Sequence, residues 1–462
     1  MVKILVATWG NPWLRYPPES DQDYRWRKVK YCIEVEEGMQ CEESESRTTL
    51  PLLVDRYRFD KVVIVVQDTV VDSVADSYAK LRKRVEEMYR EFLKEVGLDG
   101  TNLDIVVASG VGRYATLSRM NRVPLVFQGS LTDFYMFVLA EVSKILADAV
   151  EGKDELEVFV DLSHGLNYMP TLTYRAVKEL ASLAAWGLEK VVFRVLNSEP
   201  YVEGVKELHI HLVEDVELKP TTPAKAFDSS KPIRLLKFLE KDVSIAREIA
   251  KEFSSIDVAK LSAFLGSIAN GLPLLLISTF PRDEELRSAI DRAIRYYIEL
   301  TEITYRDTVV YVRRRVAFRE QFEVLTTAWF LTRMLKRYVS SASDEVSLLR
   351  IDEIVKKVLG RNKKLRYMIS RDIYELKEML GSTRLNEWTP LYKLYPKDDT
   401  ECSPENIRKA KDRFVRNFLA HSGFEICVTL AKHVDNEIVL RYRDELKDLI
   451  FEAAVEGLQI VS

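Results

Sequence analysis

The 462-residue sequence has few of the residue types that build disulfide frameworks or metal clusters. It contains only four cysteines, and no two of them have the C-x-x-C spacing. Five histidines leave little material for a metal cluster. We therefore expect no disulfide framework, no structural zinc site and no metal or other cofactor. The cysteines are Cys32, Cys41, Cys402 and Cys427.

Long apolar runs, an excess of one charge and several catalytic signatures are also missing. No stretch of about 18 uninterrupted apolar residues exists, and the N-terminus lacks a signal-peptide cleavage pattern, so we expect a cytoplasmic protein without a membrane span. A P-loop, H-E-x-x-H and G-x-S-x-G are absent. The net charge of −4 excludes a globally basic nucleic-acid binder but leaves room for a local basic groove.

The first half of the sequence alternates predicted strands and helices. The strands are near-continuous runs of Val, Ile, Leu and Phe, which is typical of strands buried on both faces. This alternation predicts an α/β Rossmann-like domain with a mainly parallel sheet. The predicted strands are Lys3–Thr8, Lys61–Val66, Leu103–Ser109, Leu125–Phe127, Glu157–Ser163 and Lys190–Leu196, and the helices are Asp72–Glu95, Leu131–Val150 and Thr171–Trp186.

The second half has a different pattern. The segment Lys219–Ala224 contains two prolines and two threonines, and from about Ile233 apolar residues recur at spacings of three and four. We therefore predict an all-α helical C-terminal half, with a ligand-sensing domain over 1–222, a helical linker region over 223–325 and a further helical domain over 326–462. Thr304–Val316 is an exception, which fits either a hairpin or a buried helix turn.

Two loops that follow predicted strands carry the residues of a candidate ligand site. One is Trp9–Trp13, and the other is Asp161–Pro170. Ligands of parallel sheets bind at the carboxyl edge, where both loops lie, and a glycine at a helix N-terminus can hold a phosphate. The alternative is that the glycines only make tight turns and His164 is a satisfied loop histidine. From these loops we assign ligand binding to Gly10, Asn11, Trp13, Ser163, His164, Gly165 and Asn167.

A third loop allows a weaker ligand assignment. In Phe127–Asp133, Ser130 followed by Asp133 resembles a capping box, and helix capping is the simplest role of this loop, but Gln128 and Ser130 are included as candidate ligand contacts.

A further loop resembles a nucleotide-binding motif. Gly110–Ala115 fits the G-x-G-x-x-A fingerprint of dinucleotide-binding proteins. Too few residues follow it for a crossover helix before Leu125, which argues against a nicotinamide-dependent enzyme.

The C-terminal half contains an Arg–His pair that could cleave RNA. His421 can take a proton from a 2′-hydroxyl or give one to the leaving 5′-oxygen, while Arg416 can stabilise charge on the scissile phosphate. Five residues are about 140° around an ideal helix, so the pair shares no helix face unless Ser422-Gly423 ends the helix or a second chain completes the site. The alternative is an amphipathic helix with His421 in the core and Arg416 solvated.

The C-terminal half also contains two runs of basic residues. One run leads into the motif and is the better candidate for steering RNA; the other ends at Tyr367, which could stack on a base, although core packing is its simpler reading. A charge run can also be an ordinary solvated helix face. The first run is Arg408, Lys409, Lys411 and Arg413, and the second is Lys356, Lys357, Arg361, Lys363, Lys364 and Arg366.

Two motifs resemble those of one known family. R-N-x-x-x-H, with Arg416, Asn417 and His421, is similar to the R-x(4–6)-H motif of HEPN ribonucleases. W-G-N-P after the first strand and D-L-S-H-G-L-N-x-x-P after a later strand look like the ligand loops of CARF domains. A sensor followed by a helical nuclease resembles the CARF–HEPN ribonuclease family of type III CRISPR systems (the Csx/Csm group) over essentially the whole chain.

The resemblance implies a function and an assembly. Paired CARF domains would bind a cyclic oligoadenylate, with cyclic tetra-adenylate as the favoured activator. Paired HEPN domains would form one composite, metal-independent site that cleaves single-stranded RNA to 2′,3′-cyclic phosphate and 5′-hydroxyl ends, with Arg416, Asn417 and His421 as catalytic residues. The chain would be a homodimer, and larger assemblies of dimers are compatible with it.

Two other functions stay open from the sequence. One is a nucleotide-sensing regulator that binds nucleic acid through its helical half without cutting it. The other is a small-molecule α/β enzyme that uses only the sheet-edge loops.

Overall fold

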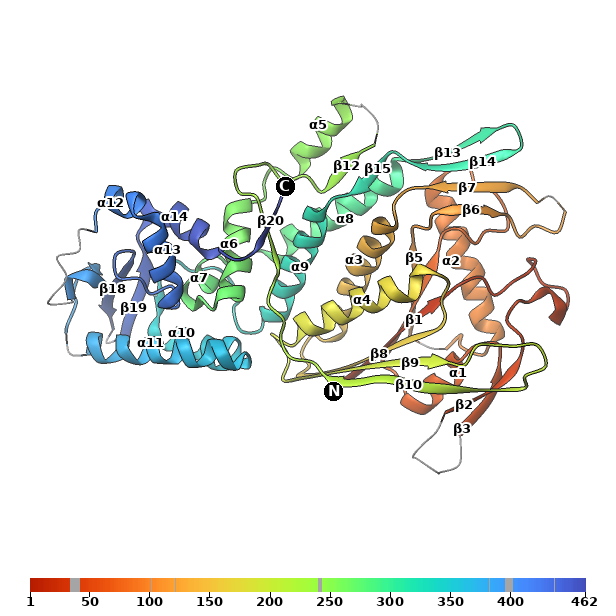
Figure 1. Cartoon of the computed structure of the whole chain (residues 1–462), viewed down its shortest axis with the longest axis horizontal. Coiled ribbons are helices and arrows are strands. Elements are labelled where there is room, and N and C mark those ends of the chain that lie inside the picture. The colour runs from red at the N-terminus through yellow and green to blue at the C-terminus, as the bar shows by residue number, and fades with distance from the viewer. Residues whose placement is uncertain are drawn as a thin grey trace. The chain divides into compact units, whose positions relative to one another are not determined.

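A mixed eight-stranded sheet forms the framework of the N-terminal part of the chain, with strand order β3-β2-β10-β9-β8-β1-β4-β5 (Figure 1). The structure is a computed structural model, and it describes residues 1–33, 42–100, 102–120, 122–239, 243–381, 383–394, 402–435 and 437–462. Contacts divide the chain into two units. Unit 1 comprises 1–218, 235–246 and 290–323, and unit 2 comprises 219–234, 247–289 and 324–462. The segment 223–325, which we predict as a linker region, thus contributes to both units.

Five adjacent strands of this sheet are parallel, as the sequence predicts. They are β1 (Val2–Trp9), β4 (Lys61–Gln67), β5 (Leu103–Ala108), β8 (Glu155–His164) and β9 (Lys190–Ser198). The other three are β2 (Val29–Ile33), β3 (Glu42–Ser46) and β10 (Glu207–Glu217). β10 is antiparallel to β9 because the connection between them is too short for a crossover helix. Since β3 is also antiparallel to β2, the sheet is mixed rather than purely parallel.

Helices cover both faces of the sheet. Leu5, Ala7 and Trp9 of β1 share a core with residues of α1 (Leu50–Tyr57) and α2 (Tyr78–Glu95). α3 (Leu131–Ala149) and α4 (Tyr168–Ala184) pack against each other and against strands of the sheet (Figure 1). Alternate residues of the buried strands therefore face different helix layers, which explains their nearly unbroken apolar sequence.

A second sheet in unit 1 has the order β13-β14-β7-β6. The predicted strand around Leu125 lies here and not in the large sheet. Thr304–Val316 forms most of a hairpin, with Asp307 at φ 54° in its turn, so the buried-helix alternative is wrong. The strands are β6 (Gly112–Ala115), β7 (Pro124–Gln128), β13 (Thr301–Arg306) and β14 (Val309–Arg314); β12 (Leu236–Phe238) and β15 (Val316–Phe318) form a further pair.

The C-terminal half is mainly helical, but the all-α prediction is wrong. β18 and β19 form a hairpin within a small sheet of order β16-β19-β18-β17, and β11 pairs with β20. The strands are β11 (Lys225–Phe227), β16 (Val346–Ser347), β17 (Thr389–Pro390), β18 (Thr429–Val434), β19 (Glu437–Tyr442) and β20 (Gln459–Val461). The helices are α5 (Val243–Glu252), α6 (Val258–Asn270), α7 (Pro273–Ser278), α8 (Asp283–Glu299), α9 (Glu320–Leu335), α10 (Leu348–Lys357), α11 (Lys363–Gly381), α12 (Pro404–Lys409), α13 (Lys411–Ala420) and α14 (Lys447–Ala454). None of the described helices is long and apolar enough to cross a membrane.

Cysteines are paired in this structure, contrary to the expectation from their spacing. Cys402 and Cys427 form a disulfide with a Cα–Cα distance of 5.2 Å, and Cys32 is also disulfide-bonded. The fold brings Cys402 and Cys427 together across 25 positions, which a rule about short spacings cannot detect. The loop that they close contains α12 and α13, and closing a loop of that length stabilises the folded state by about 3 to 4 kcal/mol.

A buried ion pair joins the second sheet of unit 1 to the end of β4. Arg314 Nη2 lies 2.5 Å from Asp68 Oδ2, and neither side chain is accessible to solvent. Asp68 also accepts hydrogen bonds from the Tyr78 hydroxyl and the Gly110 backbone N–H, while Arg314 donates to the Gln128 carbonyl at 3.0 Å. The pair therefore fixes β14 beside the two loops that follow β4 and β5.

Replacing one member of this pair is expected to destabilise unit 1 strongly. Arg314→Met keeps most of the side-chain volume but leaves the Asp68 carboxylate buried without its cation, which costs about 3 to 5 kcal/mol. Asp76→Ala is the control, because the Lys80–Asp76 pair is 69% and 70% exposed, and an ion pair so exposed to solvent adds little to stability. Urea unfolding followed by tryptophan fluorescence measures both. Equal losses for the two variants would contradict the assignment.

Candidate functional site

The carboxyl edge of the large sheet brings the two predicted ligand loops together. β1 and β8 are adjacent parallel strands, and Trp9 is paired with His164 across them. Directly after β1, the Gly10 N–H donates to the His164 carbonyl at 2.8 Å. Parallel pairing thus places the loops as the sequence predicts.

A buried carboxylate holds the second loop in shape. Asp161, at 1% exposure, accepts hydrogen bonds from the Ser163 N–H and hydroxyl and from the Thr49 hydroxyl at 2.6 Å. The Ser163 hydroxyl also accepts from the Ser198 N–H at 2.9 Å. Ser163 therefore positions the loop with its hydroxyl already engaged on both sides.

His164 is a neutral, stacked histidine. Its Nε2 accepts the Thr49 N–H at 3.2 Å, so the ring proton is on Nδ1. The ring lies 4.5 Å from that of Trp26 and 6.1 Å from that of Tyr31. Burial lowers the pKa of His164 to about 4, against the opposing charge of Asp161. The histidine is thus a satisfied loop residue that also has one N–H to offer a ligand.

A pocket of about 370 Å³ opens beside this histidine. Three of the predicted ligand residues line it, namely Ser163, His164 and Gly165. The rest of its lining was not predicted from the sequence, and it includes Arg25, Trp26, Arg27, Asn197, Ser198 and Tyr201. The segment Tyr24–Arg27 alternates aromatic and basic residues, and that composition was the available signal.

The arginines around this pocket are not equivalent. Arg25 is exposed, and within the described part of the chain its guanidinium has no partner. Arg47 is 2% exposed and is fully engaged: it donates to the Trp26 carbonyl and pairs with Asp21 and Glu95. Arg25 can therefore contact an anionic ligand, whereas Arg47 supports the loop that carries it.

The other predicted ligand residues of the first loop have structural roles. A Cβ at Gly10 would lie 2.4 Å from Leu166, and one at Gly165 would lie 2.4 Å from Thr8 Oγ1, so both glycines are required for close packing. The Asn11 side chain accepts the Trp13 N–H at 2.9 Å. Trp13 is 1% exposed and packs on Tyr16, Tyr89 and Phe92 in the core.

The remaining predicted contacts lie outside this pocket lining. Ser130 accepts the Thr132 N–H at the start of α3, which is the capping role. Gln128 is an exposed residue at the end of β7, and Asn167 is exposed at φ 53° before α4. The Gly110–Ala115 segment continues into strand β6 and not into a helix, which agrees with rejecting the dinucleotide fingerprint.

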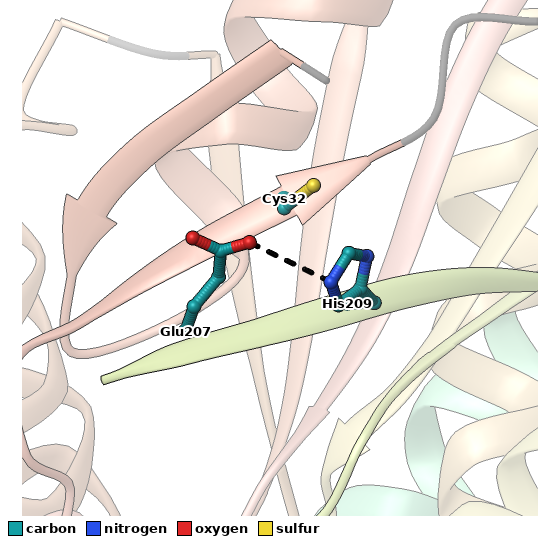
Figure 2. Close-up of side chains that lie close together, drawn as sticks. All are labelled: Cys32, Glu207 and His209. Carbon is teal, nitrogen blue, oxygen red and sulfur yellow. Dashed lines mark ion pairs between the residues drawn. The ribbon is translucent and has the colours of Figure 1, made fainter. Parts of the chain in front are cut away.

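One group of possible metal ligands lies on the neighbouring strands β2 and β10. Figure 2 shows Cys32, Glu207 and His209 close together, with His209 Nε2 at 3.6 Å from Glu207 Oε1. Because Cys32 is disulfide-bonded, it offers no thiolate to a metal ion. The remaining ion pair is partly exposed, and we assign it no metal.

In unit 2, the Arg–His pair lies at the end of α13. The helix ends at Ala420, and His421 follows at φ −110° and ψ 32°. Both Arg416 and His421 are exposed, and within the described residues neither side chain has a hydrogen-bond or ion-pair partner. The core alternative for His421 is therefore wrong, and the end of the helix removes the constraint of the 140° spacing.

Residues that pack beneath the turn after His421 hold its backbone in place. Ser422 has φ 50° and donates its hydroxyl to the buried Asp372 of α11 at 2.6 Å. Gly423 has φ 83°, and a Cβ there would lie 2.9 Å from the Tyr442 hydroxyl. Asn417 is half-buried, and its carbonyl accepts the His421 N–H at 3.0 Å. A polar residue and a glycine thus set the direction of the imidazole.

Ion pairs neutralise most of the basic run before the motif. Three of its residues pair with acidic side chains at 2.6 to 2.7 Å: Arg408 with Asp448, Lys409 with Glu405, and Lys411 with Glu452. The run therefore carries less free charge next to Arg416 than the sequence suggests.

Comparisons with known proteins agree with this two-part organisation. Residues 4–200 match the CARF-domain model of the CRISPR system endoribonuclease Csx1, and residues 362–444 match its HEPN-domain model. These ranges contain the sheet-edge loops and the Arg–His pair, respectively.

Two relatives are informative to different degrees. Among solved structures, Enterococcus italicus Csm6 bound to cyclic hexa-2′-fluoro-hexa-dAMP covers 99% of this chain and 100% of its own, at 11% identity and a TM-score of 0.25. So low a score does not establish a shared fold. CRISPR system endoribonuclease Csx1 from Methanocaldococcus jannaschii is 34% identical over 93% of this chain and 86% of its own length. With that identity and coverage, the chain belongs to the Csx1 family of CRISPR system endoribonucleases.

Proposed function

We propose that this chain is a metal-independent single-stranded endoribonuclease of type III CRISPR defence that cyclic tetra-adenylate activates. The observation that carries the nuclease proposal is the Arg416–His421 pair at the end of α13, on a turn fixed by Asp372. Both side chains are exposed and have no hydrogen-bond or ion-pair partner among the described residues, so they are available to a substrate. Family membership supports the ribonuclease class.

The two side chains divide the chemistry of RNA cleavage between them. The imidazole of His421 takes the proton of the 2′-hydroxyl or gives one to the leaving 5′-oxygen. The guanidinium of Arg416 donates to the non-bridging oxygens as charge builds on the phosphate. Attack by the 2′-oxygen leaves a 2′,3′-cyclic phosphate and a 5′-hydroxyl, and it consumes no water. Asn417, beside Arg416 on α13, completes the proposed site.

A second chain would complete both sites. Cleavage requires a base for the 2′-hydroxyl and an acid for the leaving 5′-oxygen, and one histidine cannot be both at the same moment. A homodimer with two Arg416–His421 sets would supply both. In the sensor, two copies of the pocket beside His164 would face one ring of four adenylates. Arg25 would contact a phosphate, and Trp26 would stack on a base. If the activator binds more tightly to the state in which the nuclease pair is aligned for cleavage, its binding would shift the population towards that state.

Removing the imidazole is expected to abolish cleavage. In EDTA with cyclic tetra-adenylate, His421→Ala lowers kcat for a fluorescent single-stranded RNA by about 10² to 10⁴, the usual contribution of a general acid or base. His433→Ala is the control, because the ring of this histidine of unit 2 accepts the Leu385 N–H and is not part of the proposed site. Gel analysis of the cleavage products gives both rate and end groups.

The same assay separates the alternative functions. Unchanged cleavage by His421→Ala would reject the assigned chemistry. If the unsubstituted protein bound activator and RNA without cutting, the nucleotide-sensing regulator would be the correct function.

Removing the Arg25 cation from the sensor pocket is expected to weaken activator binding. Arg25→Ala loses one charge-assisted contact, which corresponds to about a tenfold rise in Kd for cyclic tetra-adenylate. Lys83→Ala removes the same charge from an exposed position on α2, and we expect no change there. Isothermal titration calorimetry measures both. An unchanged Kd for Arg25→Ala would place the ligand elsewhere.

The neutral histidine of this pocket is expected to make unit 1 sensitive to acid. The ordinary pKa of histidine is about 6.5 and that of folded His164 is about 4, so the unfolded state binds more protons between these values. The free energy of unfolding of unit 1 is therefore not lowered by His164 above about pH 6.5, and it falls as the pH drops towards 4. His164→Gln is expected to flatten this dependence, and His211→Gln, at an exposed position, to retain it. Urea midpoints across that pH range test the difference; parallel slopes would contradict it.

A further inference from the structure

We propose that the outer face of α11 binds the single-stranded RNA substrate. This face, defined by Lys363, Lys364, Arg366, Tyr367, Arg371 and Tyr374, combines free cations with exposed aromatic rings. The inference rests on the proposed nuclease function and adds a substrate surface that the catalytic pair by itself does not supply.

Three of the four cations of the α11 face are not neutralised within the described part of the chain, whereas Arg371 pairs with Asp372 and Glu375. In the preceding helix, Lys356 pairs with Asp352 and Lys357 with Glu353. In contrast, Lys363, Lys364 and Arg366 have no hydrogen-bond or ion-pair partner for their side chains in the described part of the chain. Their positive charge is therefore available to phosphates.

The position of these cations is unfavourable for the helix itself. They lie in the first turn of α11, which contains no acidic residue, and the helix dipole is already positive there. Cations at this end cost stability, and they repel one another. Positions where a sequence departs from the locally stable choice are expected at functional surfaces.

Two aromatic rings accompany the cations. Tyr367 is 78% exposed and Tyr374 is 64% exposed, so the core-packing reading of Tyr367 is wrong. Tyr374 is seven positions after Tyr367, which places both rings on one side of the helix about 10 Å apart. Exposed rings next to free cations are the features that bind single-stranded nucleic acid, because bases stack on the rings while phosphates meet the charges.

The helix that carries the α11 face also supports the catalytic turn. Arg371 Nη2 lies 3.4 Å from Asp372 Oδ1, and Asp372 accepts the hydroxyl of Ser422, the residue after His421. Tyr367 is one helical turn before Arg371, and Tyr374 is nearly one turn after it. Around the helix axis the buried Asp372 lies about 140° from Tyr367 and about 160° from Tyr374, so a strand bound on the α11 face would pass around the helix to reach His421.

Binding to a cleavage-deficient protein tests the surface apart from catalysis. In a full-length His421→Ala background, fluorescence anisotropy with a labelled single-stranded RNA, in the presence of cyclic tetra-adenylate, gives Kd. Tyr367→Ala and Tyr374→Ala are each expected to raise Kd about 5- to 150-fold, the range for one lost base stack. Tyr→Phe at either position keeps the ring and is expected to retain binding. Tyr305→Ala removes a tyrosine of 65% exposure from β13 and is the matched control.

The charges are tested by the salt dependence of binding. Neutralising Lys363, Lys364 and Arg366 with Gln is expected to lower the slope of log Kd against log salt by about 2. Unchanged Kd values for both Tyr→Ala variants would overturn the proposal. It would also be overturned if these variants changed the oligomeric state in sedimentation, since the face would then be an interface between copies. RNA binding that depends on the tyrosines in a protein that never cleaves would retain the surface and reject the nuclease.

Discussion

One buried charge constrains much of unit 1. Asp68 directly follows β4, and its carboxylate is fully buried. A buried negative charge without a cation would destabilise the fold strongly, so a positive charge has to lie beside it. Its cation comes from Arg314, nearly 250 positions later in the chain. This requirement draws β14 into a sheet with β7, although the intervening sequence contributes to unit 2. The same carboxylate holds Gly110, so the loops after β4 and β5 share one anchor.

The ligand loops show how residues that look functional can have structural roles. Asp161 uses its oxygens on Ser163 and Thr49, and His164 uses Nε2 on the Thr49 N–H. These hydrogen bonds hold the D-L-S-H motif in place at the edge of the pocket, and the second imidazole nitrogen of His164 still has an N–H for a ligand. The polar groups that remain free come from the unremarkable segment before β2, where Arg25 has no partner in the described structure. Recognition of a ligand in this pocket thus depends on both segments.

The catalytic turn follows a similar principle. The side chains of Arg416 and His421 have no hydrogen-bond or ion-pair partner in the described structure, and their position depends on the backbone turn that carries His421. Ser422 accepts a left-handed conformation because its hydroxyl reaches the buried Asp372, and Gly423 is needed where a Cβ would meet Tyr442. Asp372 belongs to α11, whose outer face is basic and aromatic. A single helix therefore supports the catalytic turn on one side and offers free charges and rings on the other.

The sequence by itself determined the parallel core, the strand-edge loops and the Arg–His motif. The reason is that these features depend on local pattern: buried strands need apolar runs, and parallel pairing sends their carboxyl ends to one edge. Hairpin β18–β19 was not predicted, because its strands do not alternate strictly between apolar and polar residues and Asp435-Asn436 lacks the glycine of the common two-residue turns. Only the tertiary structure decided which groups are free. The Cys402–Cys427 disulfide, the Arg408–Asp448 pair and the Arg314–Asp68 pair join distant positions, and no local pattern encodes a partner 25, 40 or 246 residues away.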